Sequence, residues 1–131
     1  VVIGVGKGIG GPQNLAALEA LSTALGGAAL AATRDVTDEG WLARQHQVGL
    51  TGRAISPRFY FAIAVRGAFE HTVGVRRAGT IVAVNKNPKA PIFQQADFGI
   101  AADWTEALPP LAREIEAARK RSSPIAGVEE A

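Results

Sequence analysis

Apolar residues in this chain gather in short continuous runs that are separated by polar, glycine-rich or proline-rich segments. Runs of about four to eight apolar residues without alternation are typical of strands that are buried on both faces of a sheet. The sequence predicts such strands over residues 1–5, 28–33, 58–65, 80–84 and 98–102. The run "RFYFAIAV" is rich in aromatic and branched residues, which favours a central strand.

Helical spacing appears between these runs. Leucines at positions 15, 18, 21 and 25 predict a helix that begins near Pro12 and stops at Gly26. We expect a short helix over residues 68–75, and an irregular connection or one short helix near Trp41 within residues 34–47. Residues 86–93 read as a proline-punctuated loop.

The last predicted helix opens at Thr105 or at the Pro109-Pro110 pair. Its apolar face holds Leu111, Ile115 and Ala118, and its negative end holds Arg119, Lys120 and Arg121. Alternating strands and helices of these lengths predict an α/β domain: a three-layer Rossmann-like fold with a parallel sheet of five or six strands and helices on both faces. We expect this domain to span residues 1–121, followed by a flexible C-terminal tail at 122–131.

Composition narrows the function. The chain has 131 residues, 47% of them apolar, and its 14 basic and 12 acidic side chains leave a formal net charge of +2. Without a basic run interleaved with aromatics, we expect no nucleic-acid partner. The sequence has no cysteine and only two histidines, so we expect no metal site. No apolar run is long enough to cross a membrane, so we expect no direct membrane insertion. Because methionine is absent, we expect a part of a longer protein.

The first apolar run leads into the spacing Gly6-x-Gly8-x-x-Gly11. Between a strand and a helix, this pattern is typical of dinucleotide binding, and an acidic residue about 20 positions on would then bind the ribose of NAD. Asp35 is the candidate, although Arg34 stands beside it. One alternative is therefore an NAD-dependent enzyme, and another is that the glycines only allow close packing of strand and helix.

Polar or glycine residues follow every predicted strand, and the carboxyl ends of parallel strands meet at one edge of a sheet. These residues are Gly6-Lys7-Gly8, Thr33-Arg34, Arg66-Gly67, Asn85 and Asp103. The cationic residues among them, Lys7, Arg34 and Arg66, together with a helix beginning at Gly67, predict an anion site. Asn85 and Asp103 suit a base or a ribose. Since no nucleophile and base stand in a recognisable context, the sequence favours a nucleotide cofactor that brings its own chemistry.

Several longer segments carry a resemblance to a known family. They are "GKG" at 6–8, "TRDVTDEGW" at 33–41, "QVGLTG" at 47–52, "YFAIAVRGAFEHTVGV" at 60–75 and "IVAVNKNPKAPIFQQADFGIAAD" at 81–103. In order and spacing they resemble the C-terminal FAD-binding domain of the electron transfer flavoprotein alpha subunit. The block "VNKNPKAPIFQQADFG" is the most specific of these segments.

The resemblance implies an FAD site in which each matching residue has a place. Lys7, where the family usually has arginine, would lie by the cofactor. Thr33 and Arg34 would also line the site, with Arg34 near the isoalloxazine ring. Val48, Gly49, Leu50 and Thr51 would run along the flavin, with the Thr51 hydroxyl near N5. Arg66, Gly67, Ala68, Phe69, Glu70 and His71 would wrap the pyrophosphate, His71 reaching the flavin carbonyls. Asn85, Asp103 and Trp104 would hold the adenosine, and Asp35 would become an ordinary loop acid.

Four positions depart from the family pattern: Leu50 stands for a glutamine, Arg66 for a serine, Phe69 for an aliphatic residue and Glu70 for a glutamine. The Glu70 carboxylate near a pyrophosphate is unfavourable unless Arg66, expected four residues earlier on the same helix, pairs with it. These departures give some weight to a third interpretation, an interaction module that has lost its ligand.

The resemblance also implies partners. We expect an electron carrier rather than an enzyme, one that pairs with an electron transfer flavoprotein beta subunit. It would pass electrons from flavin dehydrogenases to a membrane quinone reductase or similar acceptor. The location would be the cytoplasm in a bacterium or the mitochondrial matrix in a eukaryote.

Overall fold

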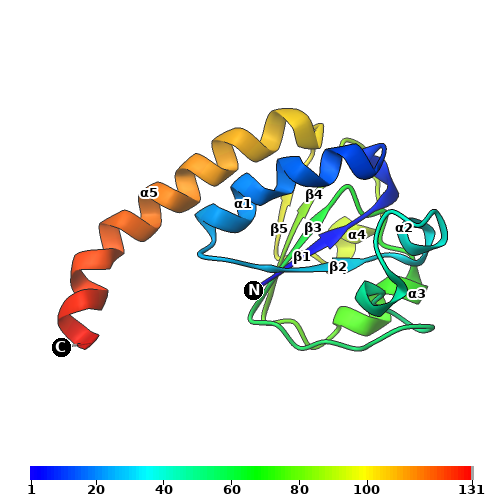
Figure 1. The fold of residues 1–131 in the computed structure, drawn as a ribbon, viewed down its shortest axis with the longest axis horizontal. Helices are drawn as coiled ribbons and strands as arrows, with labels where there is room; N and C mark the ends of the chain where they lie inside the picture. Colours follow the sequence, from blue (N-terminus) through cyan, green and yellow to red (C-terminus); the bar gives the residue numbers. More distant parts are fainter. Residues whose placement is uncertain (131) are drawn as a thin grey trace.

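A computed structural model describes residues 1–130 of the chain, and the side chains of residues 1–121. Its centre is a parallel sheet built from β1 (Val2–Val5), β2 (Ala29–Ala32), β3 (Phe59–Ile63), β4 (Thr80–Val84) and β5 (Phe98–Ile100). The strand order is β2-β1-β3-β4-β5, and every neighbouring pair is parallel. The predicted α/β class and parallel sheet are confirmed, with five strands in the described chain (Figure 1).

Side chains alternate across the sheet and build one apolar layer on each face. In β3, Phe61 and Ile63 belong to the cluster that includes Leu18 and Leu21 of α1 (Leu18–Ala24). Tyr60 and Ala62 belong to the opposite cluster, which Val75, Ala90 and Ile92 complete. Because successive residues of a strand point to opposite faces, one continuous apolar run serves both layers.

Helices cover both faces, as expected for a three-layer domain. Helix α1, preceded by a 3₁₀ turn at Pro12–Ala17, lies beside the long α5 (Trp104–Glu130) on one face (Figure 1). The remaining helices are short: α2 (Arg34–Asp38), α3 (Phe69–Thr72), which continues as a 3₁₀ turn over Val73–Val75, and α4 (Ile92–Gln95).

Two short helices differ from the sequence prediction. Helix α2 begins directly after β2 rather than near Trp41, and its buried residue Val36 joins the core. Helix α4 lies within the predicted loop, where Ile92 is fully buried and its backbone N–H donates to the carbonyl of Arg66 at 2.9 Å. These contacts with distant residues stabilise elements that local sequence alone does not favour.

Helix α5 begins at Trp104 and runs to Glu130, so Arg119, Lys120 and Arg121 lie within it rather than in its last turn. The expected dipole contribution of these three cations is therefore wrong, since such effects fall off within one turn of the helix end. The division of the chain into a domain ending at residue 121 and a separate tail stays a prediction. None of the helices described has the length and apolar character needed to cross a membrane.

Candidate functional site

The strand order reverses at β1, which pairs with β2 on one side and β3 on the other. In open parallel sheets, ligands bind in the crevice beyond the carboxyl ends of the strands at such a point. Here the loop after β1 meets the loop after β3. The N–H of Gly6 donates to Ile63 at 3.0 Å, and the N–H of Gly8 donates to Ala64 at 3.3 Å. The two loops therefore form one joined floor.

Gly6 shows why this loop needs glycine. A Cβ atom at this position would lie 2.1 Å from the carbonyl oxygen of Ala64, which no side chain tolerates. The packing interpretation of the glycine run therefore applies to Gly6. The same close approach also brings Lys7 and Gly8 to the edge of the crevice.

Two cavities open over this floor. The larger has a volume of about 500 Å³ and the smaller about 70 Å³, and Gly8 and Ala64 line both. The predicted residues that line the larger cavity are Lys7, Thr33, Arg34, Val48, Thr51, Arg66, Gly67, Ala68, Glu70 and His71. Those that line the smaller one are Asn85, Asp103 and Trp104. Since these residues come from loops after β1, β2, β3, β4 and β5, the sheet edge gathers them as the sequence analysis expects.

The structure does not bring every predicted residue to these cavities. Gly49 and Leu50 line a separate open depression of about 870 Å³ together with Arg76 and Arg77. Phe69 is 67% exposed and lines neither of the two cavities over the floor. These three residues line neither of the two cavities, and their place at FAD stays a prediction.

Positive charge at the larger cavity comes from three side chains with different partners. Lys7 pairs with Glu39 at 3.4 Å and Arg34 pairs with Asp38 at 3.5 Å, both on the protein surface. Exposed pairs of this kind contribute little free energy, so an anion of a ligand competes with them easily. Within the part of the chain whose side chains are described, no ion pair involves Arg66, which is exposed at the cavity.

Arg66 and Glu70 do not stand on one helix, because α3 begins at Phe69. Among the side chains described, no ion pair joins the two, so the condition under which a pyrophosphate would tolerate the Glu70 carboxylate is not met. The shortness of α3 also weakens the expected contribution of a helix dipole to an anion site at Gly67.

His71 is buried, and both of its ring nitrogens have partners within the chain. Nδ1 lies 3.0 Å from the carbonyl oxygen of Val48, which can only accept, so Nδ1 carries the proton and donates. Nε2 then accepts from the hydroxyl of Tyr60 at 2.5 Å. Burial lowers the pKa of His71, which favours the neutral ring. A contact between His71 and a flavin carbonyl would therefore require one of these bonds to be exchanged.

Asn85 and Asp103 have local structural partners at the smaller cavity. The Asn85 amide donates to the carbonyl of Val65 at 2.9 Å and its oxygen accepts from the N–H of Asn87 at 2.8 Å. Asp103 caps α5, since its carboxylate accepts from the hydroxyl of Thr105 at 2.7 Å and from its N–H at 2.9 Å. Hydrogen bonds from Thr105 lower the pKa of Asp103. Both side chains are thus held in place at the cavity wall.

Several residues of the larger cavity were not among the predicted site residues: Gly8, Asp35, Asp38, Gln47 and Ala64. Asp35 belongs to α2 rather than to a loop, and its carboxylate accepts a hydrogen bond from Thr33, which corrects its expected place. Gly8 and Gln47 lie inside the quoted motifs "GKG" and "QVGLTG", so that signal was available. Ala64 lies inside the quoted segment at 60–75, but nothing there distinguishes it from its apolar neighbours.

Comparison with known proteins agrees with this geometry. A family model described as "Electron transfer flavoprotein FAD-binding domain" matches residues 1–76. The chain is 43% identical over 116 residues to the electron transfer flavoprotein subunit alpha of Thermoanaerobacterium thermosaccharolyticum, covering 88% of this chain and 35% of that protein. It is 42% identical over 117 residues to the same subunit of Mycobacterium tuberculosis, covering 89% and 36%.

A mitochondrial relative is also similar. The electron transfer flavoprotein subunit alpha of Oryza sativa subsp. indica is 44% identical over 115 residues, covering 88% of this chain and 32% of that protein. The chain thus spans about a third of the length of the curated relatives it matches. The family match covers more than half of the chain and includes the loops after β1, β2 and β3 that form the larger cavity. The chain therefore belongs to the FAD-binding domain family of the electron transfer flavoproteins.

Proposed function

We propose that this chain binds FAD across the two cavities and acts as the FAD-binding domain of an electron transfer flavoprotein alpha subunit. Its partner would be a beta subunit, and together they would carry electrons from flavin dehydrogenases to a quinone reductase or similar acceptor. Relatives include bacterial subunits and subunits named as mitochondrial, so we place the chain in the bacterial cytoplasm or the mitochondrial matrix.

One observation carries this proposal: the two cavities lie side by side at the same edge of the sheet, since Gly8 and Ala64 line both. An extended dinucleotide would lie along such an edge, with part of the molecule at each cavity. The larger cavity falls within the range of about 300–1,000 Å³ that small-molecule sites occupy. The size and the position of the cavities therefore support the proposal of FAD as the ligand.

The charges also fit. Lys7, Arg34 and Arg66 bring cations to the larger cavity, where the resemblance puts the flavin and the pyrophosphate. Because α3 has only four residues, side-chain charge rather than the helix dipole has to attract the phosphates. At the smaller cavity Trp104 offers a flat ring, and Asn85 and Asp103 offer hydrogen-bonding groups for an adenosine.

When bound, FAD supplies the electron transfer, and the chain supplies position and electrostatics. Arg34 would stabilise negative charge on the reduced ring once it exchanges Asp38 for the cofactor. Thr51 would offer a hydroxyl from the opposite loop of the same cavity. Val48, beside it, is buried and holds His71 through its carbonyl, which keeps this wall of the cavity fixed.

The test is a titration of the chain with FAD, followed by quenching of flavin fluorescence and by the visible spectrum, with and without a beta subunit from a relative. We expect saturable binding at one site. Arg66→Ala should weaken binding about tenfold, because a charge-assisted contact to a phosphate is lost. The matched control is Arg58→Ala, which changes an exposed arginine just before the other end of β3 and should leave affinity unchanged.

Absence of FAD binding both alone and with a beta subunit would overturn the proposal. Equal weakening by Arg58→Ala and Arg66→Ala would contradict the assigned place of the phosphates. Binding of NAD in place of FAD in the same titration would favour the nicotinamide alternative.

A further inference from the structure

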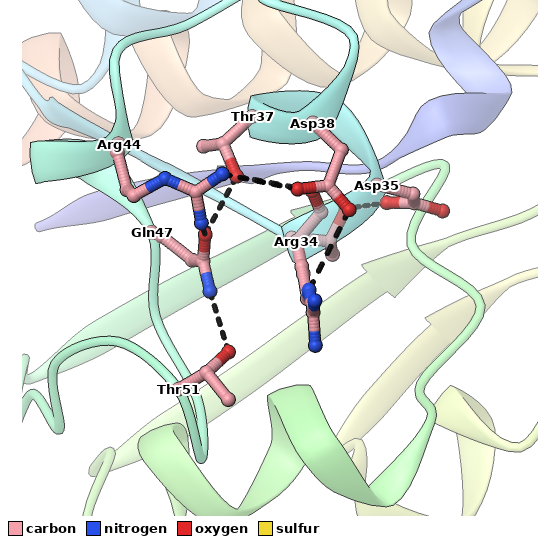
Figure 2. A network of polar contacts seen from close by, with 8 residues as sticks. Arg34, Asp35, Thr37, Asp38, Arg44, Gln47 and Thr51 are labelled. Atoms are coloured by element: carbon pink, nitrogen blue, oxygen red, sulfur yellow. Dashed lines mark hydrogen bonds and ion pairs between the residues drawn. The ribbon is translucent and has the colours of Figure 1, made fainter.

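Gln47 is a buried polar side chain that the proposed function does not use. It is 1% exposed, and it lies between α2 and the loop that carries Thr51 (Figure 2). Its Oε1 accepts from the hydroxyl of Thr37 at 2.6 Å and from the guanidinium of Arg44 at 3.3 Å. Its Nε2 donates to the hydroxyl oxygen of Thr51 at 2.7 Å.

The direction of these bonds follows from the chemistry of the donors. A guanidinium can only donate, so the atom of Gln47 that faces Arg44 must be the oxygen. The NH₂ group then faces Thr51, and an NH₂ group can only donate. The oxygen of Thr51 accepts that bond. Its own proton is left to point elsewhere, and among the side-chain bonds described for residues 1–121 no other partner of this hydroxyl occurs.

Thr51 is exposed and lines the larger cavity. We infer that Gln47 is a positioning residue: by donating to Thr51 it directs the Thr51 hydroxyl proton into the cavity, where it serves as a donor to a flavin ring atom. This inference rests on the proposed function. Arg44 also donates to Asp38 at 3.2 Å, and Asp38 pairs with Arg34, so the same network ties the two sides of the cavity together (Figure 2).

A single isosteric change reverses the polarity of this network. In Gln47→Glu a carboxylate still accepts from Thr37 and Arg44, but it also accepts from Thr51, which turns the hydroxyl proton away from the cavity. The substitution adds a charge, and Gln94→Glu adds the same charge at an exposed position on α4 as a matched control. Repeating Gln47→Glu in a Thr51→Val background separates the effect of the added charge from the effect on the Thr51 hydroxyl.

We expect Gln47→Glu to weaken FAD binding about tenfold when Thr51 is present, and threefold or less in the Thr51→Val background. The visible absorption band of bound FAD should shift in Gln47→Glu and not in Gln94→Glu. If Gln47 has a purely structural role, Gln47→Glu should weaken FAD binding equally with Thr51 and with Val at position 51. The absorption band of bound FAD should then be the same in Gln47→Glu and Gln94→Glu. That result, obtained with a parent chain that binds FAD, overturns the role of Gln47 and leaves the proposed function standing. A parent chain that binds no FAD, either alone or with a beta subunit, overturns both.

A second measurement does not depend on the folding of Gln47→Glu. In the chain without FAD, the side-chain amide of Gln47 gives its own ¹⁵N–¹H nuclear magnetic resonance signals. Thr51→Val should move these signals and speed their exchange with solvent, because the NH₂ group loses its acceptor. Thr51→Ser, which keeps a hydroxyl, should leave them close to those of the parent. Unchanged signals in Thr51→Val would overturn the inference.

Discussion

Ala64 occupies a backbone position at the site that suits glycine better than alanine. Its φ is 56°, and among the residues that the structure describes it alone combines a side chain with a positive φ. Its carbonyl accepts from Gly8, and its N–H donates to Val84 at 2.8 Å, so the surrounding loops fix the conformation. A left-handed residue with a Cβ atom costs about 1–2 kcal/mol, and such strain is typical of functional sites.

Replacement of Ala64 by glycine should therefore raise the free energy of unfolding by about 1 kcal/mol, since the loss of strain exceeds the entropy that glycine adds to the unfolded chain. Urea denaturation measures the change. Ala62→Gly in β3, which is buried with an ordinary backbone, should instead lower the free energy by about 1 kcal/mol. A loss of stability in Ala64→Gly equal to that in Ala62→Gly would contradict the strain.

His71 makes stability depend on pH. Its pKa in the folded chain lies below the ordinary value of 6.5 because the ring is buried. Below about pH 6.5 the unfolded chain binds a proton that the folded chain rejects, so the free energy of unfolding should fall as the pH drops toward the folded pKa. Above about pH 6.5 the ring is neutral in both states, and the contribution of His71 to the free energy of unfolding is fully present.

Denaturant titrations between about pH 7.5 and pH 5 measure this dependence. His71→Gln should flatten the curve over that window, because the side chain that takes up the proton on unfolding is removed. An unchanged slope in His71→Gln would show that another group titrates there.

At the scale of elements, a side chain of α5 contacts the C-terminal end of α1. Arg119 donates to the carbonyl of Ala24, the last residue of α1, at 2.9 Å. Sequence analysis placed this cation at the negative end of its own helix. In the structure it acts at the negative end of a neighbouring helix, which a pattern within one segment cannot reveal.

Arg119→Ala should lower the free energy of unfolding by about 1 kcal/mol, because a charge-assisted bond to an otherwise free helix-end carbonyl is lost. Lys120→Ala provides the control. Lys120 pairs within α5 with Glu116 at 3.5 Å on the surface, and its loss should cost about 0.5 kcal/mol or less. Thermal unfolding of both variants measures the difference, and equal effects would argue against the contact between the helices.

Strands β1 to β4 were predictable because each is a continuous apolar run that contributes to both layers, as Tyr60 and Phe61 of β3 show. The short helices were not, because tertiary contacts stabilise them. Ile92 is buried against the sheet although Pro88 and Pro91 precede it, and α2 directly follows β2 because Val36 packs into the core. Local propensity is a weak guide wherever such contacts decide.

At the scale of the whole molecule, the rule that ligands lie beyond the carboxyl ends of parallel strands predicted one part of the larger cavity's wall from sequence, namely Lys7, Gly8, Thr33, Arg34, Arg66 and Gly67. The family resemblance, not the rule, gave Val48, Thr51, Ala68, Glu70 and His71. Lys7, Arg34 and Arg66 stand at one cavity because each follows a different strand of the same sheet. The rule could not predict that Asn85 and Asp103 line a separate cavity. Nor could it predict that the Gln47 side chain donates a hydrogen bond to Thr51. Those features depend on where side chains end rather than on where strands end.

Gly8 and Ala64, the two residues that line both cavities, bear on which nucleotides the proposed site would accept. If the ligand lies across both cavities as proposed, a mononucleotide such as FMN would contact only one of them, whereas a dinucleotide would gain contacts in both. Selection between the two flavins would then depend on the length of the ligand and not on recognition of the ring that both flavins share. A larger side chain at Ala64 would shift that preference toward the shorter molecule.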